Sequence, residues 1–427
     1  MHLRRIQVEN WRMLEKVDWD LGTTGDRSWH VIVGPNGSGK STLLRAISLG
    51  LLGTELSEQM DPNIKGLLAE GSEHAIVGIR AVSTSGFDRQ LGEWRDGTPI
   101  DIALGLRIRN INGSRELAKA ARSVKRVTST VWNGDDSLGW YSASIGANRR
   151  FRGNDTTLVR YFAGRSKIIR NLTLFYEEIS LEGALDWIRS LEDSTSPDYN
   201  PELLLRIAAT LNMPGILPFG VRVNSLGKSN KLTAPDGTVV NLDAMSEGFK
   251  SLFAIVFEVL RGMAEVYGPD RLFDDAAPSV VAPGVVLVDE IDSHLHPEWQ
   301  REIGGALTEA FPRVQWIVTT HSPFVAQHAI EGTILRLPAP DEDEEAIVLK
   351  GEEYRKAVYG DVTDSLDSIA FSVGQTRSDE AQALLMELAG LNVASRHEAL
   401  SSSDRARQKE LLKLFPEVEQ RLPVIQL

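Results

Sequence analysis

Residues 34–42 read Gly34-Pro35-Asn36-Gly37-Ser38-Gly39-Lys40-Ser41-Thr42, and this stretch decides the fold. It matches the pattern GxxxxGK[ST] of a phosphate-binding P-loop. The apolar run 29–33 before it is typical of a short buried strand, and residues 43–47 after it continue as a helix. A strand that leads through a glycine-rich turn into a helix N-terminus directs several backbone N–H groups at one anion. The sequence therefore predicts a nucleotide-binding P-loop within an α/β fold.

The P-loop residues have distinct predicted contacts with ATP. We expect the Lys40 ammonium to reach the β- and γ-phosphates, and the Ser41 hydroxyl to bind Mg²⁺. The predicted ATP-binding residues of this stretch are Gly34, Pro35, Asn36, Gly37, Ser38, Gly39, Lys40, Ser41 and Thr42.

Two apolar runs further along the chain end in polar residues. Residues 285–288 lead into Asp289-Glu290, and residues 315–320 lead into His321. Both runs are continuously apolar, which is typical of a parallel sheet covered on both faces. At the carboxyl end of its strand, Asp289 is predicted to hold the Mg²⁺ that Ser41 also binds. Glu290 is predicted to orient or deprotonate the attacking water, and His321 to hydrogen-bond the γ-phosphate.

A second predicted anion site lies at Ser246-Glu247-Gly248, directly before the apolar helix 252–260. The chain already has a P-loop for its own ATP. We therefore expect Ser246 and Gly248 to bind the γ-phosphate of ATP held by a second copy, in a head-to-tail homodimer with two ATP molecules at its interface.

The order of patterns predicts an ATPase core that is split by an insertion. We expect a mainly parallel core sheet, a small antiparallel sheet from the N-terminal strands, and helices in both the insertion and the tail. The predicted segments are 1–110 for the first half of the core, 111–235 for a basic helical insertion, 236–335 for the second half of the core, and 336–427 for a helical tail. Within these, residues 114–127 and 171–191 are predicted to be helices, and residues 221–223 and 239–242 to be two strands.

Composition limits the class of protein and its compartment. The chain has 427 residues, of which 42% are hydrophobic and 25% charged, as in an ordinary globular protein. It contains 0 cysteines, which excludes disulfides, cysteine-bound zinc and thiol catalysis, and fits the cytoplasm. No apolar run reaches the roughly 18 residues of a membrane span, and the N-terminus lacks a signal-peptide core. We therefore expect a cytoplasmic protein with no membrane partner.

Charge is distributed unevenly along the chain. The net charge is -13, yet residues 107–170 contain 14 Lys and Arg against 4 Asp and Glu. Such a segment could meet nucleic acid or an acidic partner, or it could be a solvated surface whose charges pair internally. Arg149 and Arg150 in this segment are further candidates for phosphate contact. Arg12 could lean over the nucleotide or be a surface turn residue.

The ordered set of motifs resembles that of ABC-type ATPases, in the soluble branch with the SMC and RecF proteins. The resemblance implies that Ser246-Glu247-Gly248 is the signature motif, that Ser293-His294-Leu295-His296 is the D-loop, and that His321 is the switch histidine. Ser293 and His294 thereby become candidate site residues. The signature departs from LSGGQ, with Met245, Glu247 and Phe249 at three of its positions.

The stretches 289–300 and 319–323 are closer still to compact prokaryotic ATPases of the Septu and retron type, PtuA-like proteins of phage defence. This resemblance implies an ATP- and Mg²⁺-dependent homodimer, or higher oligomer, that regulates a partner effector, a nuclease of the HNH type. The alternative is a RecF-like ATPase that binds DNA in repair or recombination. The motifs do not separate the two, because both functions use the same ATPase residues.

Overall fold

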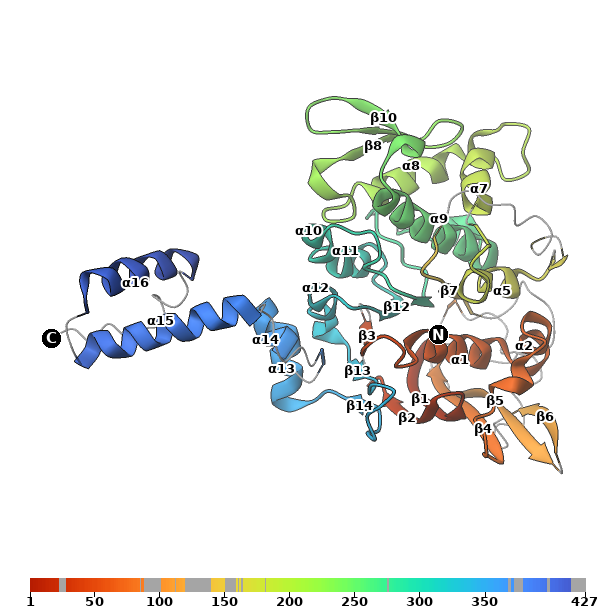
Figure 1. Ribbon diagram of the computed structural model, residues 1–427. Coiled ribbons are helices and arrows are strands. Elements are labelled where there is room, and N and C mark those ends of the chain that lie inside the picture. Colours follow the sequence, from red (N-terminus) through yellow and green to blue (C-terminus); the bar gives the residue numbers. More distant parts are fainter. Residues whose placement is uncertain are drawn as a thin grey trace. The chain divides into compact units, whose positions relative to one another are not determined.

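The computed structural model describes residues 1–22, 28–84, 86–87, 101–111, 113–119, 140–149, 159, 161–162, 164–180, 182–274, 276–367, 370–371, 379–397 and 400–415. The chain forms two compact units, Met1–Phe371 and Ser372–Leu427, and each is described by itself. Figure 1 shows the elements of both.

The centre of the first unit is a six-stranded, mostly parallel sheet with the order β14-β13-β3-β12-β11-β7. Its strands are β3 (Trp29–Val33), β7 (Ser142–Ile145), β11 (Gly284–Val288), β12 (Val314–Thr319), β13 (Ile334–Arg336) and β14 (Ile347–Val348). Only the short β14 pairs antiparallel, with β13, among the described strands of this sheet. Every residue of β3, β11 and β12 is buried. This confirms the predicted α/β fold with a parallel sheet covered on both faces.

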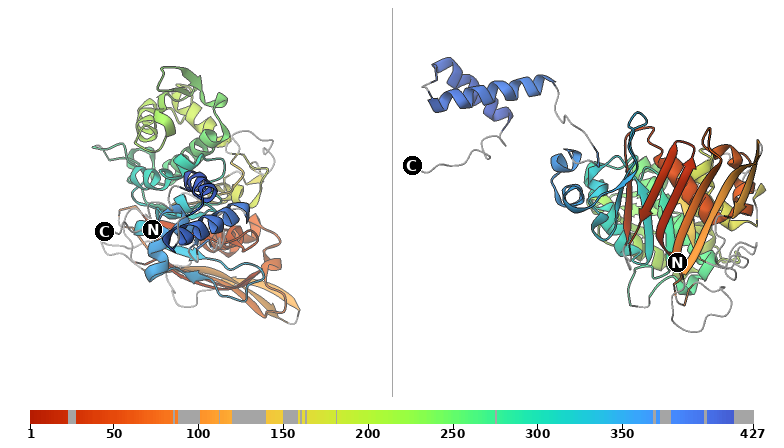
Figure 2. Two further views of the ribbon diagram at one scale, coloured as in Figure 1. Left: turned by 60° about the vertical axis from the view of Figure 1, so that its left-hand side comes forward. Right: turned by 90° about the horizontal axis from the view of Figure 1, so that it is seen from below.

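An antiparallel sheet lies beside it, with the order β2-β1-β4-β5-β6 (Figure 2, right). Its strands are β1 (His2–Trp11), β2 (Leu14–Asp20), β4 (His74–Val82), β5 (Asp101–Ile111) and β6 (Ser114–Lys119). The helix predicted from residue 114 is wrong, because residues 114–119 pair with β5 as an edge strand. Residues 120–127 of that prediction lie outside the described residues.

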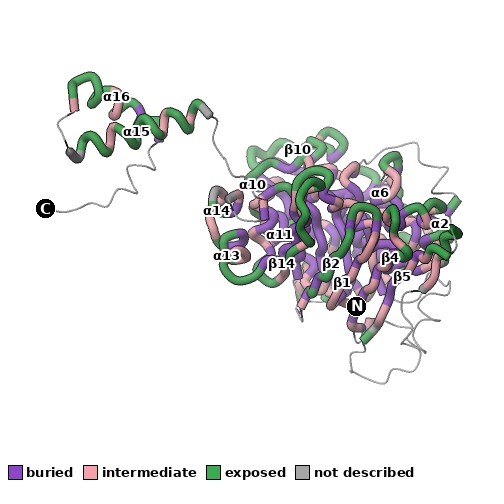
Figure 3. Tube along the Cα trace, turned by 60° about the horizontal axis from the view of Figure 1, so that its bottom comes forward, coloured by how far each residue is buried: buried purple, intermediate pink, exposed green. Residues whose placement is uncertain are grey.

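Two apolar clusters cover the two faces of the parallel sheet. On one side, α1 (Lys40–Leu52) and the antiparallel sheet bury Ile32 and Leu287. On the other, α9 (Glu247–Tyr267), α11 (Ile303–Ala310), α7 (Glu182–Glu192) and α8 (Pro201–Leu211) bury Val31 and Val286. Purple segments in Figure 3 trace this interior. Packing against the two faces of the sheet holds α1, which follows the P-loop, and α9, which follows Ser246, in place.

The region predicted as an insertion contains both helices and strands. The residues expected to form one helix over 171–191 contain two helices, α6 (Leu172–Phe175) and α7. The two expected strands are β8 (Arg222–Ser225) and β10 (Val239–Asn241), and both pair with an unforeseen strand, β9 (Lys231–Thr233). The other helices of the first unit are α2 (Thr54–Met60), α5 (Ser166–Ile169), α10 (Pro297–Gln300), α12 (Pro323–Ala326), α13 (Gly351–Tyr359) and α14 (Val362–Asp367). The four segment boundaries stay a prediction.

The second unit is a hairpin of α15 (Asp379–His397) and α16 (Ser402–Leu414). Leu388, Leu411 and Phe415 are its buried apolar side chains, and Arg407 bonds Glu387 across the two helices. The tail therefore contains helices, as the sequence predicts. Among the described residues of the chain, no helix has the length and apolar character needed to cross a membrane.

Candidate functional site

The predicted site residues follow neighbouring strands of the parallel sheet. The P-loop follows β3, Asp289 follows β11, and β12, which ends at Thr319, lies between these two strands. The loop that carries Arg149 follows β7, on the other side of β11. Because the carboxyl ends of parallel strands meet at one edge of the sheet, all four loops converge there.

The P-loop has the backbone of an anion cradle. Gly34, Gly37 and Gly39 all have positive φ, at 151°, 82° and 93°. A Cβ at Gly34 would lie 2.7 Å from the carbonyl oxygen of Leu337, so this close approach requires glycine. No side chain caps the N-terminus of α1. Its first N–H groups therefore remain for an anion, which fits the phosphates of a nucleotide.

Lys40, the first residue of α1, is buried beneath this loop. Its Nζ donates hydrogen bonds to the carbonyl oxygens of Gly34 and Pro35, at 2.9 and 3.0 Å. Burial lowers the pKa of Lys40, while Asp289 and Glu290 act in the opposite direction. The ammonium and the two carboxylates are therefore close enough for their charges to interact.

Asp289 is buried, and its orientation is fixed by a neighbouring strand. Thr319 Oγ1 donates a hydrogen bond of 2.6 Å to Asp289 Oδ1. The carboxylate is thus held at the end of β11 beside Lys40 and α1. A buried carboxylate and the Ser41 hydroxyl are oxygen ligands of the kind Mg²⁺ prefers, so the residues fit this ion.

His321 is exposed at the same edge, after β12. Partial desolvation and the Lys40 charge lower the pKa of its imidazole, while Asp292 and Glu290 oppose the shift. Lowering the pKa favours the neutral ring near pH 7. The backbone of the turn is held by Thr320, whose Oγ1 donates to Asp292 Oδ1 at 2.6 Å and accepts from Ser322 N at 2.9 Å.

Ser246 and Gly248 lie at the N-terminus of α9, where Gly248 packs against the predicted D-loop. Ser246 is the exposed N-cap residue, and no side chain caps this helix. Gly248 is buried against His294, because a Cβ at Gly248 would lie only 2.5 Å from the His294 carbonyl oxygen. His294 itself is exposed and has a φ of 66°. Ser293 N donates to the Glu290 carbonyl at 2.9 Å, so the predicted D-loop is hydrogen-bonded to the Asp289-Glu290 pair.

Gly248→Ala tests this close approach. We expect the free energy of unfolding to fall by about 1–3 kcal/mol, because the added methyl group must displace the His294 backbone. Urea denaturation measures the change. Gly183→Ala is a matched control, since Gly183 is also the second residue of a helix but has open space around it. The control is expected to gain up to about 1 kcal/mol from helix propensity. Equal stability changes in the two variants would contradict the packing argument.

The further arginine candidates have different surroundings. Arg12 is exposed, has a φ of 52°, and lines a cavity of about 200 Å³ together with Thr42 and Arg45. Arg149 is buried and bonds backbone carbonyls of the Asp289-Glu290 pair. Arg150 lies outside the described residues, as do the stretches 120–139 and 150–158 of the basic segment 107–170.

Comparison with known families agrees with this geometry. The family described as "AAA domain, putative AbiEii toxin, Type IV TA system" matches residues 73–326, more than half of the chain. The chain belongs to this AAA family. A second description, "P-loop containing region of AAA domain", matches residues 3–60 of the AAA protein.

Relatives of this AAA protein include a Septu protein PtuA from Bacillus mycoides, 27% identical over 82% of the chain and 42% of that protein. The chain thus spans less than half of that relative's length. A "Retron Vc95 probable ATPase" from Vibrio cholerae is 24% identical over 76% of the chain and 71% of that protein. Among solved structures, an SMC head bound to the C-terminal winged-helix domain of ScpA aligns with a TM-score of 0.47 at 18% identity, covering 83% of this chain and 99% of that one. Family and relatives confirm the predicted AAA ATPase and its resemblance to Septu and retron ATPases.

Sequence reasoning missed Thr319 and Asp292 of the AAA protein. Thr319 bonds the Asp289 carboxylate, and Asp292 bonds Thr320. A signal was present, because two adjacent threonines end the strand before His321. Their pairing could not be inferred, since the partners lie 30 and 28 residues apart in the chain, and the sequence does not specify the register of β11 against β12.

Proposed function

We propose that this chain binds ATP with Mg²⁺ at the described sheet edge and hydrolyses it. One observation carries the proposal: the P-loop with Lys40, the Asp289-Glu290 pair and His321 follow three neighbouring parallel strands, β3, β11 and β12, at one edge of the sheet. The family membership supports ATP as the nucleotide. The cavity lined by Arg12 and Thr42 adjoins the P-loop helix, and we propose that the nucleoside extends toward it.

The residues take separate roles in the proposed reaction. Backbone N–H groups of the P-loop and the Lys40 ammonium bind the phosphates, and Ser41 and Asp289 hold Mg²⁺. When bound, Mg²⁺ would neutralise phosphate charge as the terminal bond breaks. Glu290 orients the attacking water and accepts its proton. His321, whose lowered pKa favours the neutral ring, donates a hydrogen bond toward the γ-phosphate.

We further propose that two copies close around two ATP molecules. Ser246 is exposed at an uncapped helix N-terminus, which suits a phosphate from outside the chain. Gly248 joins this helix end to the D-loop backbone. When Ser246 binds a phosphate held by the second copy, the effect would therefore pass from α9 to the D-loop backbone. From there it would pass through Ser293 to the Glu290 carbonyl.

Ser246→Arg tests pairing. The bulky side chain is expected to block the phosphate of the second copy while the P-loop of its own chain still binds ATP. We expect ATP affinity within about threefold of wild type, loss of the ATP-dependent dimer by light scattering, and a fall in turnover of roughly 100-fold or more. Ser402→Arg, at an exposed first helical position in the second unit, is the control. Unchanged turnover in Ser246→Arg would contradict a role across the dimer.

The cellular role we propose is ATP-gated control of a nuclease partner of HNH type in anti-phage defence. The Septu and retron relatives support this role. The experiment is to isolate the native complex from its host with and without ATP, and to identify its components by mass spectrometry. A co-purifying nuclease supports the proposal. A dimer that comes alone and holds duplex DNA with steep salt dependence would replace it by the RecF-like alternative.

A further inference from the structure

The backbone of Glu290 has an unusual conformation for its residue type. Its φ is 45°, in the left-handed region, directly after the buried strand β11. A glutamate has no intrinsic preference for this region, and such residues persist only when surrounding contacts hold them there. The contacts of this one peptide unit therefore bear on catalysis, because they set the direction in which the Glu290 side chain leaves the strand.

The first contact is the hydroxyl of Thr319. Thr319 Oγ1 accepts a hydrogen bond from Glu290 N at 2.7 Å and donates one to Asp289 Oδ1 at 2.6 Å. Thr319 is fully buried at the end of β12, which pairs with β11. A single hydroxyl thus ties the backbone of one acid to the carboxylate of the other.

The second contact is the guanidinium of Arg149. Its Nη2 donates to the Glu290 carbonyl at 2.7 Å, and its Nη1 donates to the Asp289 carbonyl at 3.2 Å. Arg149 is buried, and although burial lowers its pKa to about 10, it keeps its charge near pH 7. The remaining donor to the Glu290 carbonyl is Ser293 N, from the turn that Glu290 itself opens.

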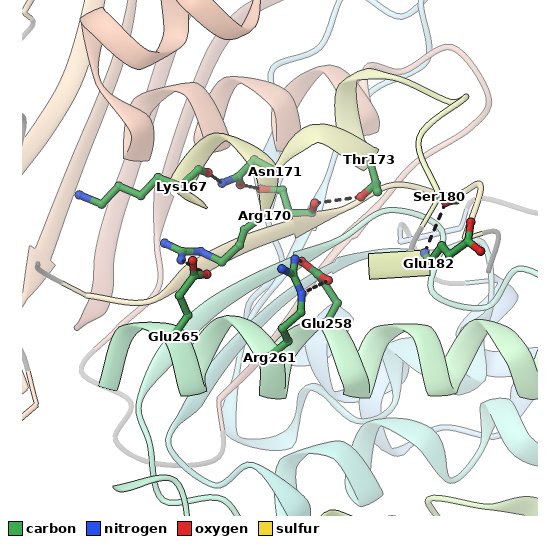
Figure 4. A network of polar contacts seen from close by, with 10 residues as sticks. Lys167, Arg170, Asn171, Thr173, Ser180, Glu182, Glu258, Arg261 and Glu265 are labelled. Atoms are coloured by element: carbon green, nitrogen blue, oxygen red, sulfur yellow. Dashed lines mark hydrogen bonds and ion pairs between the residues drawn. The ribbon is translucent and has the colours of Figure 1, made fainter. Parts of the chain in front are cut away.

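Arg149 is in turn supported from outside the catalytic edge. Its loop begins at Gly146, whose N–H donates to Thr173 Oγ1 at 3.3 Å, and Thr173 donates to the Ser144 carbonyl. Figure 4 shows Thr173 in a polar network in which Arg170 pairs with Glu265 of α9. The loop that holds Glu290 is therefore connected, through this network, to the C-terminal part of α9.

We propose that Thr319 and Arg149 are positioning residues that together hold Glu290 in its left-handed conformation, ready for the attacking water. The inference rests on the proposed role of Glu290 in ATP hydrolysis. Loss of either contact lets the Glu290 peptide relax, and the carboxylate then leaves its working position. Phosphate binding at the P-loop does not depend on this peptide, so nucleotide affinity is kept.

The experiment compares Thr319→Val and Arg149→Gln with wild type in steady-state ATPase and nucleotide-binding assays. We expect kcat to fall by at least about 10-fold, and by no more than the roughly 10²–10⁴-fold that a general base contributes. KM and ATP affinity are expected to stay within about threefold of the wild-type values. Thr319→Ser, which keeps the hydroxyl, is expected to restore kcat to within about threefold. Arg149→Lys serves as a second variant if Arg149→Gln fails to fold.

Two further measurements separate positioning from general destabilisation. Thr319→Val is expected to raise the Mg²⁺ concentration needed for half-maximal activity, because Thr319 also orients Asp289, whereas Arg149→Gln leaves that concentration unchanged. The double variant is expected to have almost the same activity as the less active of the two single variants, since both residues act through Glu290. Thr210→Val removes an equally buried hydroxyl far along the chain and is expected to lower stability without changing kcat.

The outcomes separate this inference from the proposed function. If Glu290→Gln is inactive while Thr319→Val and Arg149→Gln keep wild-type kcat, the function stands and the positioning role is wrong. If Glu290→Gln keeps wild-type turnover, the proposed role of Glu290 and the positioning role that rests on it are both overturned. A fall in kcat that is matched by loss of ATP affinity also contradicts positioning.

Discussion

Lys40→Ala is expected to weaken ATP binding by roughly 100-fold or more. The ammonium is buried beneath the P-loop, where its Nζ already donates to the Gly34 and Pro35 carbonyls. Charge-assisted hydrogen bonds contribute about 1.5–3 kcal/mol each, and each 1.4 kcal/mol is tenfold in affinity. Alanine removes this positive charge from the helix N-terminus. None of the other P-loop residues 34–42, all of which the structure describes, is a cation that could replace it. Isothermal titration with a non-hydrolysable ATP analogue measures the loss.

The matched control for Lys40→Ala is Lys16→Ala. Lys16 is an exposed lysine that pairs with Glu345, and both residues line a cavity that the P-loop also borders. Its removal is expected to change ATP affinity by less than about twofold, because exposed pairs contribute little. A thermal unfolding scan checks that Lys40→Ala remains folded. Wild-type affinity in a folded Lys40→Ala protein would overturn the assignment of the P-loop.

The P-loop could be predicted because its chemistry is contiguous in the sequence. Glycines at fixed spacing, a lysine and a hydroxyl residue lie within one turn and the start of one helix, so no long-range contact is needed to recognise them. Asp289 and Glu290 were predictable for a similar reason. In a chain that also contains a P-loop, a continuously apolar strand that ends in two acids most simply predicts a Mg²⁺ ligand followed by a carboxylate that activates water.

The remaining features depend on contacts between distant segments. Residues 114–119 contain good helix formers, yet they form β6 because β5 offers backbone partners along their length. The partners of Arg149 follow from the short strand β7 pairing with β11, which the sequence pattern does not specify. The left-handed φ of Glu290 has no sequence signal, since glutamate has no preference for that region. Structure was therefore needed for how the acids are held, although not for which acids they are.

Glu290→Gln is expected to lower kcat by about 10²–10⁴-fold while ATP remains bound. Glutamine has nearly the same shape, so the backbone contacts of residue 290 with Thr319 and Arg149 persist. The amide cannot accept a proton from water, which removes the base without disturbing the P-loop. Loss of the negative charge also removes repulsion between the residue 290 carboxylate and the phosphates, so the site becomes more favourable to bound ATP.

Because hydrolysis is blocked while binding is kept, Glu290→Gln is also expected to accumulate the closed dimer. Light scattering with ATP and Mg²⁺ should give twice the chain mass, and adding Ser246→Arg should return it to one chain. Glu331→Gln, at an exposed glutamate away from the sheet edge, is expected to match wild type in turnover and mass. A Glu290→Gln protein that binds ATP yet stays monomeric, while wild type pairs, would show that closure does not depend on retained ATP. Pairing of the wild-type protein would then need a cause other than a phosphate held between Lys40 of one copy and Ser246 of the other.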